Sequence, residues 1–412
     1  MKILVLSDDF PPEVVGGAGT IAFRMSKEFI AQGHKVKVFT TTQDKNSGEN
    51  IVFENIEINR VYSKYHDRWR AYISLYNPRV VGKLKKIIKE FKPDIIHTHN
   101  VHGHISYYAL VLAKRYAKVF MTAHDIMSFY PGTFTEFINP KDFSCLTSFD
   151  YRVRFPTLIK KFRFRYNPFQ NIIIRYCLFR TNRVIAVSGA LRDALLQNGI
   201  MNVSVIHNGI NVSEWNIPLD EVDKFRKSYN LEGLKIILFQ GRLSGAKGGD
   251  LILQAITSLS SHNPLAKLLI IGNKDAYVER MRKRVRELRI EDRVIFFGWL
   301  DEYMMKKAYA VSDAVVIPSV CFDSFPNGNL EAFASRKPVV ATCFGGSKEI
   351  VRDGENGFIV NPFNVPSLAK AIEDLLADKE KARRFGENGR RLVANEFSIE
   401  KMINEYLTFF TK

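Results

Sequence analysis

The chain contains 412 residues, more than the roughly 250–300 at which a single hydrophobic core stops growing, so two domains are expected. Hydrophobic residues make up 46% of the sequence and aromatic residues 12%, a composition that is typical of globular proteins and argues against wholesale disorder. No apolar run approaches the roughly 20 residues that span a bilayer, and the start of the chain turns acidic too early for a signal peptide. The four cysteines are too scattered for a disulfide framework. A reducing cytoplasm is therefore the expected location.

The formal net charge of +17 indicates a polyanionic partner, and its distribution matters more than its size. Residues 151–183 contain nine Arg or Lys, eight Tyr or Phe, and no Asp or Glu. Cationic side chains attract anionic headgroups and aromatic rings enter the lipid interface, so this segment predicts a peripheral position at the inner face of the membrane or a site for a lipid-linked acceptor. The alternative is a solvated basic face with its aromatic residues in the core. Nucleic acid is not expected as a partner, because no common nucleic-acid motif is present.

Strand and helix patterns alternate from the beginning of the chain. An apolar run at residues 2–7, a helical spacing at 19–34 and an alternating stretch at 35–41 form a βαβ opening. Short apolar strands that end in polar residues follow at 94–99, 119–124 and 183–189. This alternation predicts an open, mostly parallel sheet with helices on both faces.

A second set of strands begins near residue 234. These strands are expected at 234–241, 266–273, 293–299, 314–319 and 338–342, with helices at 248–259, 276–288 and 367–378. The fold class is therefore α/β, with two doubly wound Rossmann-like domains that face each other across a cleft. We place the first domain at 1–207 and the second at 208–394, with residues 208–233 as the linker region. A C-terminal helix within 395–412 is expected to complete the first domain.

Loops that follow strands in such sheets carry the chemistry, since ligands bind at the carboxyl ends of the strands. The loop "GRLSGAKGGD" at 241–250 offers the planar fork of Arg242 and the mobile ammonium of Lys247, and its glycines let the backbone approach a ligand. Together these two cations suit a diphosphate. The alternative is that both side chains are solvated.

The loop after the first strand is also rich in glycine. Gly16 and Gly17, with Gly19, precede or begin the first helix, where backbone N–H groups can face an anion. A tight strand-to-helix connection explains the same residues equally well. The full dinucleotide fingerprint is not present.

Histidines cluster after strands of the first half, at His97, His99, His102 and His104. A zinc site is not expected from them, because no Cys or carboxylate set completes it and alternate residues of a strand point to opposite faces. His124 follows another strand, at a position where it could hydrogen-bond a substrate hydroxyl or stabilise positive charge. The rival interpretation is a structural histidine that holds its own loop.

Two acids flank a turn in "CFDSFPNGNLEAF", at Asp323 and Glu331. The Pro-Asn pair favours a turn followed by a helix start, which places Glu331 in the first helical turn. A carboxylate has the acceptors to hold a vicinal diol such as a ribose 2′,3′ pair. Backbone N–H groups near Asn327 and Gly328 could hold sugar hydroxyls. An acid that merely favours a helix N-terminus would explain Glu331 and leave Asp323 without a role.

These segments, in this order, resemble the family 4 retaining glycosyltransferases, which have the GT-B fold. The family's two acids eight residues apart, most often Glu and Glu, correspond to "DSFPNGNLE", and "GRLSGAKGGD" is similar to its Gly-Arg-Leu…Lys-Gly loop. Further similarities are "VIAVSGALRDAL", "VSVIHNGIN", "RVIFFGWL", "GGSKEIVRDGENGFIV" and "TAHD". The resemblance covers nearly the whole chain and is strongest over 235–365.

The resemblance implies a nucleotide-sugar donor, a UDP- or GDP-sugar, in the second domain and the acceptor in the first. Arg242 and Lys247 would then neutralise the diphosphate leaving group, and Glu331 would bind the ribose. Asp323 and the backbone amides that follow Phe325 would hold the transferred sugar. Asp323 is one methylene shorter than the usual Glu, so its reach toward the sugar differs from the family pattern.

The resemblance also assigns the remaining donor contacts. Backbone near Phe297 and Gly298 would read the base, and Gly16 and Gly17 would approach the phosphates from the opposite side. His124 would contact the sugar near its reacting carbon. The family usually works without a metal or a cofactor, and its donor phosphate is commonly proposed to take the acceptor proton on the same face.

The expected function is therefore transfer of a sugar, with retention, to a hydroxyl of a saccharide or lipid-linked acceptor in cell-surface polysaccharide or glycolipid synthesis. Two alternatives remain. One is a sugar-nucleotide epimerase or a phosphorylase on the same architecture. The other is a non-catalytic basic binding protein in which the acids have only structural roles.

Overall fold

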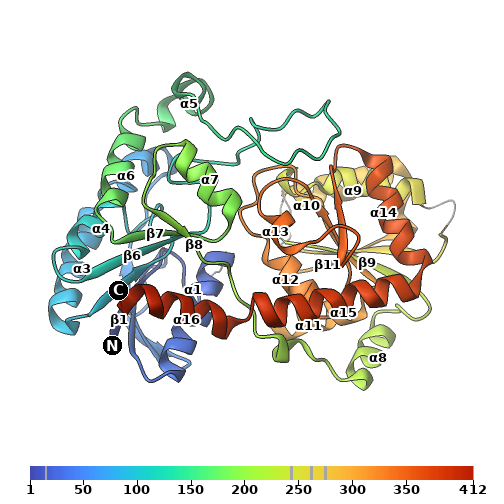
Figure 1. Cartoon of the computed structure of the whole chain (residues 1–412), viewed down its shortest axis with the longest axis horizontal. Helices are drawn as coiled ribbons and strands as arrows, with labels where there is room; N and C mark the ends of the chain where they lie inside the picture. Colours follow the sequence, from blue (N-terminus) through green and yellow to red (C-terminus); the bar gives the residue numbers. More distant parts are fainter. Residues whose placement is uncertain (14–15, 242–244, 260–262, 273–275, 412) are drawn as a thin grey trace. The chain divides into compact units, whose positions relative to one another are not determined.

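The computed structural model describes residues 1–13, 16–241, 245–259, 263–272 and 276–411. The chain forms two compact units, each built from segments that are distant in the sequence (Figure 1). Unit 1 contains Met1–Gly132, Asp150–Asn208 and Ile399–Lys412, and unit 2 contains Thr133–Phe149 and Gly209–Ser398.

Unit 1 is built around an eight-stranded sheet, counted over the described residues. The strand order is β3-β4-β2-β1-β5-β6-β7-β8, and every neighbouring pair is parallel except β3 with β4. The strands are β1 (Lys2–Leu6), β2 (Lys35–Thr42), β3 (Asn50–Phe53), β4 (Ile56–Tyr62), β5 (Ile95–Thr98), β6 (Lys118–Ala123), β7 (Arg183–Ala186) and β8 (Val203–Val205). The central strands are buried apolar runs, as expected for a parallel sheet covered on both faces.

The helices of unit 1 connect these strands and pack against them. They are α1 (Gly17–Ala31), α2 (Arg70–Ile73), α3 (Pro78–Phe91), α4 (Tyr108–Ala113), α5 (Phe155–Phe162), α6 (Gln170–Phe179), α7 (Gly189–Gln197) and α16 (Ile399–Thr411). The C-terminal helix α16 belongs to this unit, where the Phe410 ring lies 5.8 Å from that of Phe29 and the Tyr406 hydroxyl hydrogen-bonds Thr122 at 2.8 Å. The apolar face of α16 thus closes the core of unit 1.

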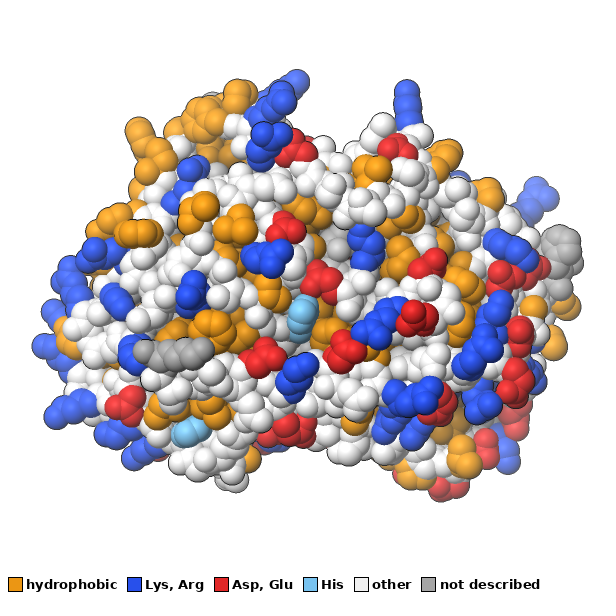
Figure 2. Space-filling view, viewed as in Figure 1, with side chains coloured by type: hydrophobic (Ala, Val, Ile, Leu, Met, Phe, Trp, Pro, Cys, Tyr) orange, Lys and Arg blue, Asp and Glu red, His pale blue; other side chains and the backbone are white. Residues whose placement is uncertain are grey.

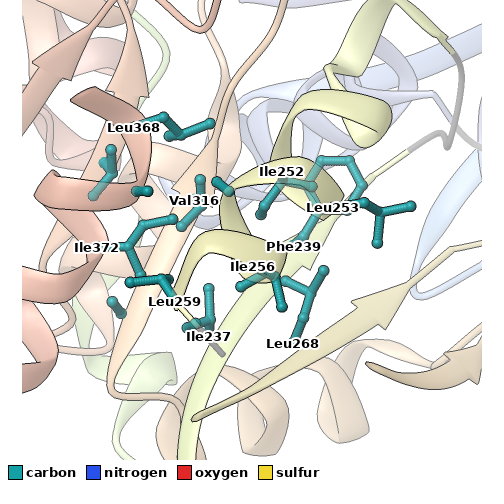
Figure 3. Packing of buried hydrophobic residues seen from close by; sticks show 14 of the residues in the cluster. Ile237, Phe239, Ile252, Leu253, Ile256, Leu259, Leu268, Val316, Leu368 and Ile372 are labelled. Carbon is teal, nitrogen blue, oxygen red and sulfur yellow. The ribbon is translucent and has the colours of Figure 1, made fainter. Parts of the chain in front are cut away.

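Unit 2 contains a parallel six-stranded sheet, again over the described residues, in the order β11-β10-β9-β12-β13-β14. The strands are β9 (Lys235–Gln240), β10 (Ala266–Ile271), β11 (Val294–Gly298), β12 (Ala314–Ile317), β13 (Val339–Thr342) and β14 (Gly357–Val360). The helices are α8 (Leu219–Ser228), α9 (Gly249–Leu259), α10 (Ala276–Leu288), α11 (Glu302–Val311), α12 (Asn327–Ala334), α13 (Ser347–Ile350), α14 (Val365–Ala377) and α15 (Lys379–Glu396). Buried side chains of the central strands interlock with α9 and α14, as Figure 3 shows for Phe239, Ile256 and Leu368.

The strand order determines where a ligand can bind in each unit. In unit 1, β1 lies between β2 and β5, and in unit 2, β9 lies between β10 and β12. Chain connections therefore leave in opposite directions beside these strands, and in doubly wound sheets the loops at such a switch point flank the ligand crevice. In unit 2 these are the loops after β9 and after β12.

The strands expected from apolar runs are all present, and four further strands were missed. β3 and β4 form an antiparallel edge hairpin joined at Glu54 and Asn55, both of which have positive φ. Their polar and exposed side chains hide the strand pattern. β8 and β14 are only three and four residues long.

Three expectations about the chain's organisation differ from the structure. Residues 208–233 were expected as a linker, but they contain α8, and the Phe225 ring stacks on Phe297 of β11 at 5.8 Å within unit 2. Thr133–Phe149, placed by sequence in the first domain, belongs to unit 2. The expected C-terminal segment of 395–412 also includes residues up to Ser398 that belong to unit 2.

Candidate functional site

The loops after β9 and β12 bring a cation and an acid together. Lys247 donates from Nζ to Oδ2 of Asp323 at 2.6 Å, and the Ser319 hydroxyl donates to the same oxygen at 2.9 Å. The Lys247 side chain is 30% exposed and that of Asp323 is 13% exposed. This ion pair is therefore partly exposed to solvent and not sealed in the core, so a ligand phosphate could compete with Asp323 for the ammonium group.

Two glycines allow these loops to approach so closely. Gly248 has φ +78°, and a Cβ atom there would lie 2.0 Å from the carbonyl oxygen of Pro318. Gly345 has φ +72°, and a Cβ atom there would lie 2.1 Å from the carbonyl oxygen of Asp323. Both positions combine a left-handed backbone with a contact that no side chain could tolerate. The amide of Gly346 also donates to the Asp323 carbonyl at 2.9 Å, so the backbone around Asp323 is held from a third loop.

Glu331 is held in place by two uncharged partners. It lies on α12, and its Oε2 accepts hydrogen bonds from Gln240 Nε2 at 3.2 Å and from the Tyr309 hydroxyl at 2.9 Å. Gln240 is the last residue of β9, and it also donates to the Tyr309 hydroxyl at 2.7 Å. Burial, reinforced by the Glu331 charge, raises the pKa of Tyr309 well above its usual value, so this hydroxyl stays a donor. The network fixes the carboxylate where it can accept further hydrogen bonds from a diol.

The helix that carries Glu331 begins where the turn predicts, with one difference. Pro326 is the N-cap residue, and Asn327 and Gly328 open α12. Glu331 consequently lies at the start of the second helical turn, not in the first as expected from the sequence. Phe325, which precedes the turn, is buried and packs 5.9 Å from the Phe397 ring.

Two of the predicted donor contacts, that of Arg242 with the diphosphate and that of the backbone near Phe297 and Gly298 with the base, stay predictions. Arg242, the expected partner of Lys247, lies outside the described residues. Phe297 packs its ring on α8, while Gly298 has φ +78° and accepts a hydrogen bond from the amide of Gly272 at 3.0 Å. The structure therefore leaves base recognition by this backbone as a prediction.

The remaining predicted site residues belong to unit 1. His124 follows β6, and its Nε2 hydrogen-bonds Nδ1 of His99 at 2.9 Å, with the two rings stacked. Burial lowers the pKa of His124 to about 4, so the imidazole is neutral at neutral pH. Gly16 is the N-cap residue of α1 and Gly17 its first residue, after the carboxyl end of β1. Their contacts with a donor in unit 2 remain predictions.

A buried carboxylate organises the histidine-rich loop after β5. Asp8 accepts hydrogen bonds from three consecutive backbone amides, those of Gly103, His104 and Ile105, at 2.5 to 2.9 Å. Hydrogen bonds from the backbone of this loop to the Asp8 carboxylate therefore hold the loop in place. Within the described part of the chain, no group of three or more His, Cys, Asp or Glu side chains is arranged to hold a metal ion.

The sequence pattern pointed to Lys247, Asp323 and Glu331 as candidate site residues, and it gave no indication of the residues that orient them. Gln240, Tyr309 and Ser319 come from three different elements and share no motif with Glu331 or Asp323. The only local signal was their position, since Gln240 and Ser319 lie at or just after the carboxyl ends of adjacent strands.

Two family models match most of the chain. The model "Glycosyl transferases group 1" matches residues 221–392, and the model "Glycosyltransferase Family 4" matches residues 15–214. The first model therefore covers the site of Lys247, Asp323 and Glu331, and the second covers most of unit 1.

Individual proteins match over the full length. An uncharacterized glycosyltransferase of Methanocaldococcus jannaschii is 27% identical and covers 100% of this chain and 98% of its own. Among solved structures, the sucrose-phosphate synthase of Thermosynechococcus elongatus has a TM-score of 0.79 at 21% identity, covering 100% of this chain and 98% of that one. Anabaena HepE in complex with UDP-glucose has a TM-score of 0.72 at 21% identity, covering 99% of each chain. The structural matches establish a shared fold.

Proposed function

Because the chain belongs to the family 4 glycosyltransferases and has their GT-B fold, we propose that it transfers a sugar, with retention and without a metal, from a nucleoside diphosphate. The acceptor is a hydroxyl group of a saccharide or a lipid-linked sugar. The observation that supports this most is the ion pair of Lys247 with Asp323 together with the oriented carboxylate of Glu331, all on segments that follow the adjacent strands β9 and β12 at the switch point of the unit 2 sheet.

The chemistry of the leaving group explains the need for Lys247. Breaking the bond between the sugar and the phosphate creates an oxocarbenium-like centre and a departing diphosphate whose negative charge grows in the transition state. A positioned ammonium group stabilises that growing charge more than it stabilises the ground state. In the proposal, Lys247 leaves its ion pair with Asp323 and pairs with the diphosphate, and Arg242 adds a second cation. Asp323 is then able to accept hydrogen bonds from the sugar.

Glu331 would hold the ribose of the donor. Its carboxylate is oriented by Gln240 and Tyr309, and a carboxylate can accept both hydrogen bonds of a vicinal diol. The solved HepE complex contains UDP-glucose, which supports a nucleotide sugar as the class of donor. UDP- and GDP-sugars are the proposed donors.

The neutral state of His124 fits a hydrogen bond to a substrate hydroxyl and does not exclude its other predicted role, the stabilisation of positive charge. A histidine whose pKa is about 4 carries no charge at neutral pH, and its Nε2 is engaged by His99. We therefore propose that His124 hydrogen-bonds a hydroxyl of the transferred sugar, and that the diphosphate takes the acceptor proton.

Two other functions make different predictions for the same site. A sugar-nucleotide epimerase or a phosphorylase would use the phosphate-binding cations but would form no new glycosidic bond to an acceptor. A non-catalytic basic protein would need no aligned network around Glu331, which weakens that alternative because Gln240, Tyr309 and Glu331 are mutually hydrogen-bonded.

A ligand screen tests the proposed donor class. We expect one family among UDP, GDP and ADP, with its sugars, to raise the thermal unfolding midpoint by several degrees, because a ligand that binds only the folded state stabilises it by mass action. Incubation of the selected donor with saccharide and lipid-linked acceptors should then give a glycosylated product. Release of free sugar or sugar phosphate alone would favour the rival enzymes, and no shift with any nucleotide would contradict the proposal.

We also propose that unit 1 binds an anionic membrane surface through residues 151–183. Phe169, the N-cap residue of α6, is 66% exposed, and Ile172 and Phe179 on α6 are 63% and 76% exposed, while Cys177 and Leu178 on the same helix are buried. Figure 2 shows hydrophobic side chains gathered with Lys and Arg over the region where Figure 1 places α5. The exposed surface of α6 is apolar as well as basic, which weakens the alternative that the aromatic residues of 151–183 serve only the core.

Helices α5 and α6, with 8 and 10 residues, are too short to span a bilayer. Among the helices of the described part, none combines the length and the apolar character needed to cross a membrane. The proposed contact is therefore interfacial: exposed rings and aliphatic side chains enter the headgroup region while Arg175 and Arg180, both exposed, meet lipid phosphates.

Vesicle binding tests this surface. We expect the protein to bind vesicles that contain phosphatidylglycerol, to bind more weakly as salt rises, and not to bind purely zwitterionic vesicles. The double substitution Ile172→Ser and Phe179→Ser should weaken vesicle binding about tenfold or more, since each buried side chain contributes about 1.5–3 kcal/mol. Val52→Ser is the matched control, because Val52 is 71% exposed on edge strand β3. Equal binding to both vesicle types would contradict the proposal.

A further inference from the structure

Thr133–Phe149, called the 133–149 segment below, belongs to unit 2 although Gly132 and Asp150 on either side belong to unit 1. Residues 124–154 are all described and contain no helix or strand. Structureless loops of more than about 12–15 residues are uncommon in compact domains and are usually functional. The contacts of this segment therefore decide what it does.

Backbone and polar contacts hold both ends of the segment. The amide of Phe322 donates to the carbonyl oxygen of Phe134 at 2.9 Å. Near the other end, Lys348 donates from Nζ to the Leu146 carbonyl oxygen at 2.6 Å, and Asn361 donates from Nδ2 to the carbonyl oxygens of Asp142 and Ser144, each at 2.9 Å. These donors come from the loops after β12 and β14 and from helix α13, which follows β13, so one segment joins three neighbouring parts of unit 2.

Aromatic packing fills the space between these anchors. The ring of Phe137 lies 5.1 to 6.1 Å from four others, those of Phe134, Phe149, Phe322 and Phe344. Phe149 also packs against Phe344 at 5.8 Å. Three of these five rings come from the segment and two from the loops beneath it, so the cluster attaches the segment to those loops.

The loops that receive these contacts are the ones that position Asp323. Phe322 immediately precedes Asp323, and Phe344 immediately precedes Gly345, which packs on the Asp323 carbonyl oxygen. The next amide, that of Gly346, donates to the same oxygen. Asp323 is thus held by its own loop and by the loop after β13, and the 133–149 segment contacts both.

We propose that the 133–149 segment positions Asp323, with Phe137 as its main positioning residue, and thereby determines how tightly the sugar part of the donor is bound. The inference rests on the proposed function, in which Asp323 contacts the sugar and Glu331 the ribose. Without the segment, the loop after β12 would have to become ordered each time a sugar binds. The entropy cost of that ordering would weaken sugar binding. Binding of the nucleotide part, through Glu331 and the loop after β9, would not depend on the segment.

Calorimetry with matched ligands separates binding of the sugar part of the donor from binding of its nucleotide part. The variant Phe137→Ala removes the central ring, and Phe143→Ala is the control from the same segment because Phe143 is 54% exposed. The ligand pairs are UDP with UDP-glucose, GDP with GDP-mannose, and ADP with ADP-glucose. We expect Phe137→Ala to weaken binding of the nucleotide sugar at least fivefold and binding of the matching diphosphate less than twofold. Phe143→Ala should change neither.

Hydrogen exchange gives a second, ligand-independent measurement. In Phe137→Ala, the peptide that contains the Phe322 amide should exchange faster, because its bond to Phe134 is no longer supported. If Phe137→Ala does not fold, Lys348→Met serves instead, since it removes the bond to the Leu146 carbonyl and keeps the side-chain stem. Unchanged exchange, or equal losses for diphosphate and nucleotide sugar, would overturn this inference alone. Failure of the wild-type protein to bind any of the six ligands would overturn the proposed function and the inference together.

Discussion

Replacing Lys247 with alanine is expected to lower kcat for sugar transfer by about 100- to 1000-fold, equivalent to about 3–4 kcal/mol of lost transition-state stabilisation. Lys247 is the cation that the structure places beside Asp323, at the carboxyl end of the unit 2 sheet. Because charge develops on the diphosphate only as the bond to the sugar breaks, the loss should fall mainly on kcat and less on KM. Single-turnover measurements with saturating donor would report this step directly.

The control for this prediction is Lys283→Ala. Lys283 lies on α10 of the same unit and its side chain is 74% exposed, so its removal changes the net charge equally without touching the site. Lys247→Arg should retain part of the activity, because it keeps the charge but changes the geometry of the donor group. A Lys247→Ala protein that remains folded and transfers sugar at the wild-type rate would exclude the proposed role.

Replacing Glu331 with glutamine should weaken binding of the donor nucleotide by about 10- to 100-fold. Hydrogen bonds to a charged partner contribute about 1.5–3 kcal/mol. The glutamine side chain also has an NH₂ group, which would face the diol hydroxyls with a donor where they need an acceptor. The effect should require the diol: the 2′,3′-dideoxy analogue of the same nucleoside diphosphate should bind the wild-type and variant proteins almost equally. Calorimetric titration with the two nucleotides measures both effects, and their difference isolates the contact between Glu331 and the ribose.

Two further variants separate a ribose contact from a structural role of Glu331. Tyr309→Phe removes the hydroxyl that orients the carboxylate and should weaken diphosphate binding less than Glu331→Gln does. Glu279→Gln is the matched control, since Glu279 lies on α10 with its side chain 74% exposed. Equal weakening of the diol and dideoxy nucleotides in Glu331→Gln would show that the carboxylate acts on the fold of the loop and not on the ribose.

Much of the fold could be predicted because its signals are local. Buried parallel strands are short runs of Val, Ile and Leu, and both β1 and β9 are visible as such runs without any tertiary information. The edge hairpin of β3 and β4 was not predicted, because β3 has only four residues and the turn that joins the strands is made by Glu54 and Asn55, two non-glycine residues with positive φ. The short strands β8 and β14 gain their hydrogen bonds from a neighbouring strand, a partner that the sequence does not specify.

The sequence by itself determined the class of fold, the residues that can carry charge at the site, and the order of the loops that present them. Lys247, Asp323 and Glu331 could be proposed from the sequence because each lies in a loop or a short helix that follows a strand. Only the tertiary structure decided how they are oriented: Gln240 and Tyr309 fix Glu331, and the loop after β13 holds the backbone of Asp323. It also decided that the 133–149 segment belongs with unit 2. The physical reason is that strand patterns arise from neighbours in the chain, whereas hydrogen-bond networks and aromatic clusters join residues whose separation in sequence carries no periodic signal.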